Sequence, residues 1–217
     1  MKKHKTSNEF SILIGILIRT VLMLLSLLFS CEKIDIQMDS QDFIIEKGQH
    51  ESTWIMEDWG ATLVQDWMLD ESCIYDLGND NQYDWNKLTG LAYESNDQMG
   101  FGYIHKYSCR VVWRWDIDRQ MFNLAPYIYE GGERFMFTSD FYVYPDELFR
   151  TAVYDYGDYW KVIIETHDNY RVYREGIYKE SRNLGHYKVL TPYFGGDEVA
   201  PHIMILKSEF ITIKRTR

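Results

Sequence analysis

The chain has 217 residues, 46% of them hydrophobic and 26% charged, which is the composition of a folded protein with room for one large domain. Residues 1–30 hold four basic residues and one acidic residue, a charge of +3, so the remainder carries −13 of the total of −10. A field of that sign repels phosphate backbones and anionic lipid head groups, which excludes nucleic acid as an expected partner and electrostatic adhesion to a membrane.

The N-terminal segment combines a basic start with a long apolar run. Lys2, Lys3 and Lys5 precede residues 10–29, which are almost wholly apolar, as in a secretory signal or a membrane anchor. About 20 residues suffice to cross a bilayer. Arg19 weakens the anchor interpretation, because a charge near the middle of a span costs about 2.5–3.5 kcal/mol. A signal peptide with an apolar region at residues 20–29 is therefore favoured.

The end of this segment resembles the lipobox of bacterial lipoproteins, with Leu28, Ser30 and Cys31 at the matching positions and the bulkier Phe29 between them. The resemblance implies a signal peptide at residues 1–30 and a mature chain that begins at Cys31. It also implies that acyl chains such as palmitate on Cys31 anchor the protein to the lipid bilayer. The expected location is the bacterial cell envelope, at the outer membrane and facing the periplasm or the surface. An uncleaved membrane anchor is the alternative.

The first part of the mature chain has few strand signals. Residues 31–42 are predicted to be a flexible tether, and residues 43–45 begin a sandwich domain at 43–217 with a first edge strand. Trp54, Trp59 and Trp67 lie in residues 51–70, whose spacing fits neither a helix nor a strand throughout. Residues 73–86 are rich in Asp, Asn and Gly, which predicts a long surface loop with its tip at 77–84.

Beyond Trp85 the sequence is typical of an all-β protein. Nine short runs rich in β-branched and aromatic residues are separated by turns and predict a single antiparallel β-sandwich. The runs are residues 87–93, 109–116, 122–129, 134–144, 148–154, 159–167, 170–174, 186–194 and 202–213. Turns are expected at 130–132 and at 168–169. Pro126 and Pro145 are expected at edges or strand ends, because proline lacks the N–H of a strand ladder.

Residues 109–116 give the clearest strand with two different faces. Cys109, Val111, Trp113 and Trp115 alternate with Arg110, Val112, Arg114 and Asp116, so the first set is predicted to face the core. The two arginines then lie about 13 Å apart on the other face. They either form a polar floor that binds a ligand or pair with carboxylates, and the pairing is the favoured interpretation.

Three stretches resemble exported bacterial lipoproteins of uncharacterised function that have concanavalin-like or jelly-roll β-sandwiches. They are residues 84–90, 108–115 and 193–202. In that family paired histidines usually precede the strand and an aspartate follows the last histidine, whereas here His105 stands alone and Ile203 follows His202. The resemblance implies the sandwich fold and little about chemistry.

The candidate ligand-binding residues are Arg110, Arg114, His105, Trp85 and Tyr83. No cofactor is predicted, and the metal content is left open. Asp197 and Glu198 could offer oxygens to Ca²⁺, but two neighbouring carboxylates are a weak signal and a solvated turn is favoured. Cys73 and Cys109 could form a disulfide in an exported protein, although two buried thiols are favoured.

The leading functional hypothesis is a non-catalytic domain that binds a carbohydrate or another extracellular ligand, because excess Trp and Tyr suit stacking on sugar rings. A structural or adhesive lipoprotein that contacts protein partners is the alternative. A glycan-cleaving enzyme of the jelly-roll class is the second alternative. It is disfavoured because the Glu-x-Asp-x-Glu pattern of such enzymes, and the carboxylate spacing of about 5–5.5 Å that it provides, is missing from the sequence.

Overall fold

The computed structural model describes residues 33–52, 58–93, 105–167, 171–179 and 187–216, without the side chains of 33–39, 58–59 and 210–216. The chain divides into two compact units, residues 1–36 with 213–217 and residues 37–212. In the first unit only the outer ends of the first and last strands, residues 33–36 and 213–216, are described. The second unit holds the two-sheet sandwich.

The described part of the chain is built from β-strands and two short 3-10 helices. They are β1 (Lys33–Ile45), β2 (Asp58–Trp59), β3 (Thr62–Leu69), η1 (Glu71–Cys73), η2 (Asp80–Tyr83), β4 (Asn86–Tyr93), β5 (Tyr107–Asp116), β6 (Met121–Glu130), β7 (Glu133–Met136), β8 (Phe141–Val143), β9 (Leu148–Asp155), β10 (Tyr159–Thr166), β11 (Val172–Tyr178), β12 (Tyr187–Leu190) and β13 (Met204–Thr216). Among these residues, no helix is both long and apolar enough to span a bilayer.

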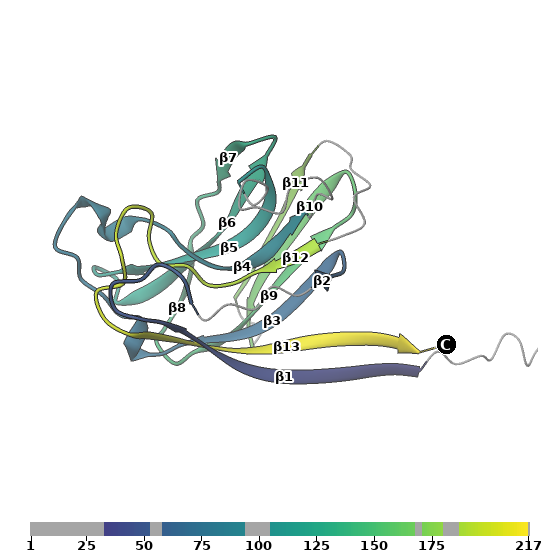
Figure 1. The fold of residues 1–217 in the computed structure, drawn as a ribbon, viewed down its shortest axis with the longest axis horizontal. Helices are drawn as coiled ribbons and strands as arrows, with labels where there is room; N and C mark the ends of the chain where they lie inside the picture. The colour runs from purple at the N-terminus through teal and green to yellow at the C-terminus, as the bar shows by residue number, and fades with distance from the viewer. Residues whose placement is uncertain (1–32, 53–57, 94–104, 168–170, 180–186, 217) are drawn as a thin grey trace, which may run out of the picture. The chain divides into compact units, whose positions relative to one another are not determined.

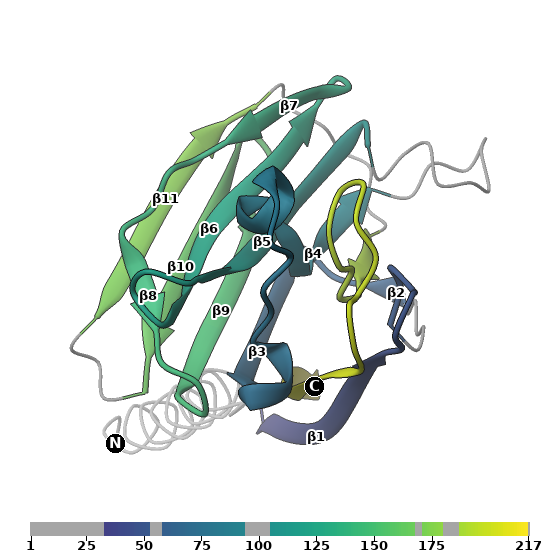
Figure 2. The ribbon, with the colours of Figure 1, turned by 90° about the vertical axis from the view of Figure 1, so that its left-hand side faces the viewer.

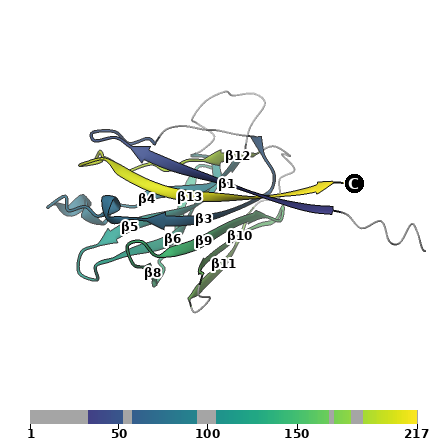
Figure 3. The same ribbon diagram turned by 90° about the horizontal axis from the view of Figure 1, so that it is seen from below.

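The strands form two sheets, which confirms the predicted antiparallel β-sandwich. Sheet A has the order β1-β13-β3-β9-β10-β11, which can be followed in Figure 3. Sheet B has the order β2-β12-β4-β5-β6-β7, with β8 also paired to β6. Figure 1 shows β4, β5 and β6 in one layer and β3, β9 and β10 in the other. Every registered pair of described strands is antiparallel.

The core lies between the sheets and follows the predicted alternation of side chains. Cys109, Val111, Trp113 and Trp115 of β5 are all buried in it, as predicted. Trp160, Val162 and Ile164 of β10 are fully buried on the facing sheet. Both Cys73 and Cys109 are buried free thiols, so the favoured interpretation of the cysteines is confirmed.

Strands β1 and β3 differ from the sequence prediction. β1 begins at Lys33, within the segment expected to be a tether, because its backbone pairs with β13 at the edge of sheet A. β3 lies where no regular element was predicted. Its period-2 pattern is weakened by Gln65, which lies between Leu63 and Trp67 on the core-facing side and accepts a hydrogen bond from Thr89, and by the apolar Val64 and Met68 on the opposite side. Trp67 of β3 is fully buried, whereas Trp54 lies outside the described residues.

Pro126 lies inside β6 and not at an edge or strand end, so that prediction is wrong. Residues 122–124 of β6 pair with β8 and residues 127–130 pair with β7, which leaves Pro126 at the seam between the two short strands. The Pro126 carbonyl points to this side, where it accepts the Phe137 amide at 3.3 Å. The nitrogen of a strand residue points the same way as its carbonyl, so the missing N–H does not interrupt the pairing of β5 with β6. The seam also explains why the run 134–144 forms two strands.

The remaining turn predictions have mixed outcomes. Gly131 and Gly132 adopt positive φ angles of 64° and 91° in the β6–β7 turn, as expected there. Pro145 lies in the turn after β8, as predicted, while the turn at 168–169 lies outside the described residues. Within the run 186–194, only residues 187–190 form a strand, β12. The chain then leaves the sheet, and Tyr193 pairs with Lys87 of β4 through an isolated bridge.

A buried polar group ties the two sheets together. The Lys179 ammonium lies 2.8 Å from Asp155 of sheet A, and both side chains are almost completely buried. The Tyr187 hydroxyl of sheet B donates to the same carboxylate at 3.0 Å, and the Tyr93 hydroxyl contacts it as well. Tyr93 and Tyr187 thus bond across the core to a charge on the opposite sheet.

Candidate functional site

A pocket of about 330 Å³ lies on the face of sheet B that points away from the core. Strands β4 to β7 supply its floor, and the segment that follows β12 supplies one wall. Figure 2 shows this segment, in yellow, beside β4. We call it the Arg110 pocket; its lining comprises Glu51, Lys87, His105, Arg110, Tyr127, Tyr129, Arg134, Leu190, Thr191, Pro192, Tyr193, Gly196 and Asp197.

Strand register places the polar floor of the Arg110 pocket. Arg110 lies opposite Tyr127, and Tyr129 lies opposite Arg134, so the outer faces of β5, β6 and β7 bring these side chains together. Lys87 joins them because a bulge between Lys87 and Thr89 adds one residue to β4. A bulge re-aims the side chains that flank it.

Arg110 is the deepest polar residue of the floor, with 8% of its surface exposed. Its Nη2 donates to the Thr191 carbonyl at 2.9 Å, and its Nε has no partner among the described residues. Burial lowers the pKa of Arg110 to about 10. In the described part of the chain, no carboxylate forms an ion pair with Arg110. The favoured prediction, that Arg110 pairs with a carboxylate, is therefore wrong for these residues.

Lys87 occupies the side of the pocket beside the wall. Its Nζ donates to the Gly195 carbonyl at 2.8 Å and lies 5.3 Å from the centre of the Tyr193 ring. Burial and the nearby positive charges of Arg110 and Arg134 lower the pKa of Lys87 to about 8, while Asp84 acts in the opposite direction. This lysine is poised to change charge within one to two pH units of neutrality.

The wall of the pocket is held by backbone contacts. Lys87 and Tyr193 exchange two backbone hydrogen bonds at 2.8 and 2.9 Å, and the Gly195 amide donates to Asn86 Oδ1 at 2.6 Å. Gly195 has a φ of 70°, and a β-carbon there would lie 2.2 Å from the Glu198 carbonyl. The His50 ring stacks on Tyr193 with the ring centres 5.1 Å apart. The tyrosine is therefore supported from outside the pocket.

His105 lies at the rim, where it is exposed and contacts Tyr129 edge to face, with the ring centres 5.3 Å apart. Partial burial lowers the pKa of His105, and the positive charges of Arg110 and Lys87 lower it further. A neutral imidazole at this position offers both a donor and an acceptor.

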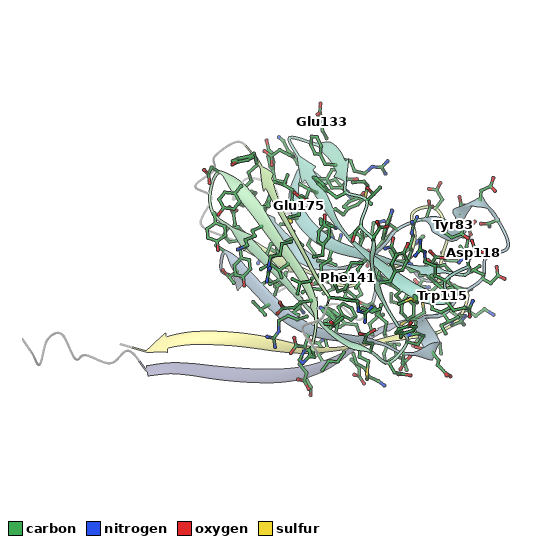
Figure 4. All side chains as sticks on the ribbon, turned by 180° about the vertical axis from the view of Figure 1, so that it is seen from behind. Tyr83, Trp115, Asp118, Glu133, Phe141 and Glu175 are labelled. Carbon is green, nitrogen blue, oxygen red and sulfur yellow. The ribbon has the colours of Figure 1, made fainter. Side chains whose placement is uncertain are left out.

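Of the five predicted ligand-binding residues, the structure brings only Arg110 and His105 to this pocket. Arg114 instead stacks on Trp85, with its Cζ 4.4 Å from the ring centre, and donates to the Tyr83 carbonyl at 3.3 Å. An apolar cluster of Val112, Ala125 and Tyr127, with Trp85 packed against it, occupies the same face between the two arginines. Figure 4 shows Tyr83 beside Asp118 and away from Glu133, which belongs to the strand that carries Arg134.

Sequence reasoning missed Lys87, Tyr127, Tyr129, Arg134 and Tyr193. Tyr127 and Tyr129 gave a usable signal, since they are two residues apart on a strand and so share a face. Lys87 gave none, because the β4 bulge that re-aims it is not visible in the sequence. Arg134 and Tyr193 depend on which strands and loops become neighbours.

The Asp197 and Glu198 pair does not act as a unit. Asp197 lines the Arg110 pocket, whereas Glu198 Oε1 accepts hydrogen bonds from Asn79 at 3.1 Å and Asn81 at 3.0 Å. Among the described residues, no group of three or more His, Cys, Asp or Glu side chains is placed to hold a metal ion. Glu198 thus holds the loop at 79–81 to the segment after β12.

The sequence matches no protein-family model and no curated protein. Among solved structures, similar chains include the alginate lyase from Klebsiella pneumoniae (9% identity, covering 71% of this chain and 59% of the lyase, TM-score 0.49). Scytalido-glutamic peptidase has 9% identity, with 83% of this chain and 82% of the peptidase covered and a TM-score of 0.46. The winged bean acidic lectin complexed with methyl-α-D-galactose has 10% identity, with 86% and 95% covered and a TM-score of 0.42. With such low identities and scores, the antiparallel two-sheet sandwich is established by the strand pairing of this chain itself.

Proposed function

We propose that the sandwich is a non-catalytic glycan-binding domain and that the sugar occupies the Arg110 pocket. The observation that carries this proposal is a pocket of about 330 Å³ in which three tyrosines stand beside hydrogen-bonding side chains. Small-molecule sites are usually concavities of about 300–1,000 Å³ with a few convergent polar groups. Tyrosine rings stack on the apolar faces of sugars, while Arg, Lys and Asp take the hydroxyl groups.

The mature protein would present this domain from a membrane. We propose that the signal peptide at residues 1–30 is removed and that acylated Cys31 anchors the chain to the envelope of a bacterium, as its lipobox-like sequence suggests. A lipid-anchored binding domain would hold glycans at the cell surface or in the periplasm.

A glycan array probed with the full-length chain in detergent tests the binding proposal. Calorimetry on a bound glycan should then show that Tyr129→Ala and Tyr193→Ala each lower the affinity about tenfold or more, because each removes a stacking ring. Tyr178→Ala is the matched control, since Tyr178 is 84% exposed and lies on β11 of sheet A. Thermal melts establish that each variant folds.

Two results would count against this function. Silence across an array of neutral and acidic glycans would remove it, and a captured protein partner would then favour the adhesive alternative. Equal losses for Tyr178→Ala and Tyr193→Ala would place the sugar outside the Arg110 pocket.

A further inference from the structure

We infer, building on the proposed glycan-binding function, that the bound sugar carries one negative charge, a carboxylate or a sulfate ester, which the Arg110 pocket neutralises. A guanidinium that is nine-tenths buried normally has an acid partner, because burying an unpaired charge is costly. Here, in the described part of the chain, Arg110 bonds one neutral carbonyl and its buried Nε bonds nothing.

The neighbours of Arg110 in the pocket are also basic. Lys87 and Arg134 line the same cavity, and His105 lies at its rim. Burial lowers the pKa of Lys87 and of His105, and the charge of Arg110 lowers both further, so these groups lie close enough to repel one another. An anion between them would relieve that repulsion and give Arg110 Nε an acceptor.

The charge balance of the lining limits the anion to one negative charge. Lys87, Arg110 and Arg134 supply three positive charges with His105 neutral, and Glu51 and Asp197 supply two negative charges, which leaves +1. The whole chain has a net charge of −10, so a polyanion would be repelled by the rest of the protein. A monoanionic group on a sugar satisfies the local balance without that penalty.

The geometry of the pocket suits an acidic sugar better than a small free anion. Tyr127, Tyr129 and Tyr193 line the same cavity, and its volume of about 330 Å³ exceeds what a single carboxylate needs. A pyranose ring can stack against a tyrosine while its acidic group points to Arg110 on the floor. Carboxylates and guanidinium groups form paired hydrogen bonds, which would fix the orientation of the ring.

The decisive experiment is binding of the full-length chain in detergent to an array of matched pairs. Each uronate-containing oligosaccharide stands beside its carboxyl-reduced counterpart, and each sulfated one beside its desulfated counterpart. We expect the acidic member of at least one pair to bind at least tenfold more tightly. Preference confined to uronates identifies a carboxylate, and preference confined to sulfated sugars identifies a sulfate.

Other array results separate this inference from the proposed function. If the two members of every pair bind equally, the acidic ligand is wrong while glycan binding stands. If the array is silent throughout, both fail.

Variants at the pocket locate the charge recognition. Arg134→Gln at the exposed rim should lower affinity for the acidic member about tenfold and affinity for the neutral member by clearly less, because the glutamine amide can still bond a hydroxyl group. Arg119→Gln removes another exposed guanidinium, one that lies outside the pocket, and should change the affinity for neither member. Arg110→Gln should cause the largest loss of affinity for the acidic member. If Arg110→Gln does not fold, Arg134→Gln still decides the test. Equal losses for both members of a pair in Arg134→Gln would overturn the inference.

Discussion

Gly90 of β4 lies directly opposite Arg110 of β5, and a β-carbon on Gly90 would stand 2.8 Å from the Arg110 Cγ and 2.2 Å from the Cys109 carbonyl oxygen. The side chain of Arg110 crosses β4 at Gly90, the residue of that strand that has no side chain. Gly90→Ala should therefore lower the free energy of unfolding by about 3 kcal/mol, because it overpacks a backbone contact. Urea unfolding measures this change.

The matched control for that substitution is Gly60→Ala. Gly60 has no atom within 4 Å of a built β-carbon and no positive φ, so its replacement should change stability by less than about 0.5 kcal/mol. A Gly90→Ala protein as stable as Gly60→Ala would show that β4 and β5 separate easily and that Arg110 is not held by this close approach.

The two faces of β5 should respond differently to substitution. Trp113 is fully buried, so Trp113→Ala should cost about 3–5 kcal/mol. Arg114 bonds one carbonyl and stacks on Trp85, and Arg114→Ala should cost no more than about 1 kcal/mol. Thermal and urea melts compare the two. Equal destabilisation would mean that Arg114 supports the fold through a buried partner.

Lys87 should make the stability of the ligand-free protein depend on pH. Its pKa is about 8 in the folded state against 10.5 ordinarily, so between these values the unfolded chain binds more protons and stability rises with pH. The penalty for burying the charged amine is fully present below pH 8 and is relieved above it. Unfolding measured from pH 7 to 9.5 should show a larger gain for the natural chain than for Lys87→Met. Parallel curves would contradict this assignment.

The same titration should act on ligand binding with the opposite sign. If an acidic sugar binds beside Lys87, its affinity falls over the pH range in which the free protein becomes more stable.

The buried Lys179–Asp155 pair predicts a strong effect of breaking it. Lys179→Met leaves the Asp155 carboxylate buried with two tyrosine hydroxyl groups and the Gly157 amide as hydrogen-bond partners but no opposite charge, and should cost about 3–5 kcal/mol. Lys207 also pairs with an aspartate, at 3.2 Å, but its side chain is 42% exposed, so Lys207→Met should destabilise the fold far less than Lys179→Met. Similar losses in the two variants would show that the Lys179 pair is open to solvent.

Lipidation predicts a defined mature N-terminus. Mass spectrometry of the natural protein should find a chain that begins at Cys31 with added acyl mass, and Cys31→Ala should release the protein from membranes. An intact chain that begins at Met1 would defeat this prediction and favour an uncleaved anchor.

Local patterns predicted the strands of this fold because one face of each is apolar. Residues 109–116 alternate clearly, and their buried face is the predicted one. β3 was missed because Gln65, buried with Thr89 of β4 as its partner, interrupts the core-facing apolar positions, while Val64 and Met68 make the opposite side apolar as well. Whether a polar residue is buried depends on distant partners, and a local pattern does not contain them.

The candidate site was predicted only in part for the same reason. The pattern of β5 placed Arg110 on the outer face, but it placed Arg114 there equally well. The two arginines differ in their contact with the segment around Thr191 and Tyr193. This segment forms one side of the pocket beside Arg110, which donates to the Thr191 carbonyl 81 residues later in the chain, and Arg114 does not line that pocket. His105 was identified from a resemblance and lies at the rim.

The seam at Pro126 also affects how the protein meets other copies of itself. A sheet edge with a long row of unpaired backbone groups is a template for strand addition and fibre growth. Because Pro126 divides the strands beside β6 into β7, of four residues, and β8, of three, this edge of sheet B has no long row to offer. One missing N–H thus protects this side of the sandwich against edge-to-edge aggregation.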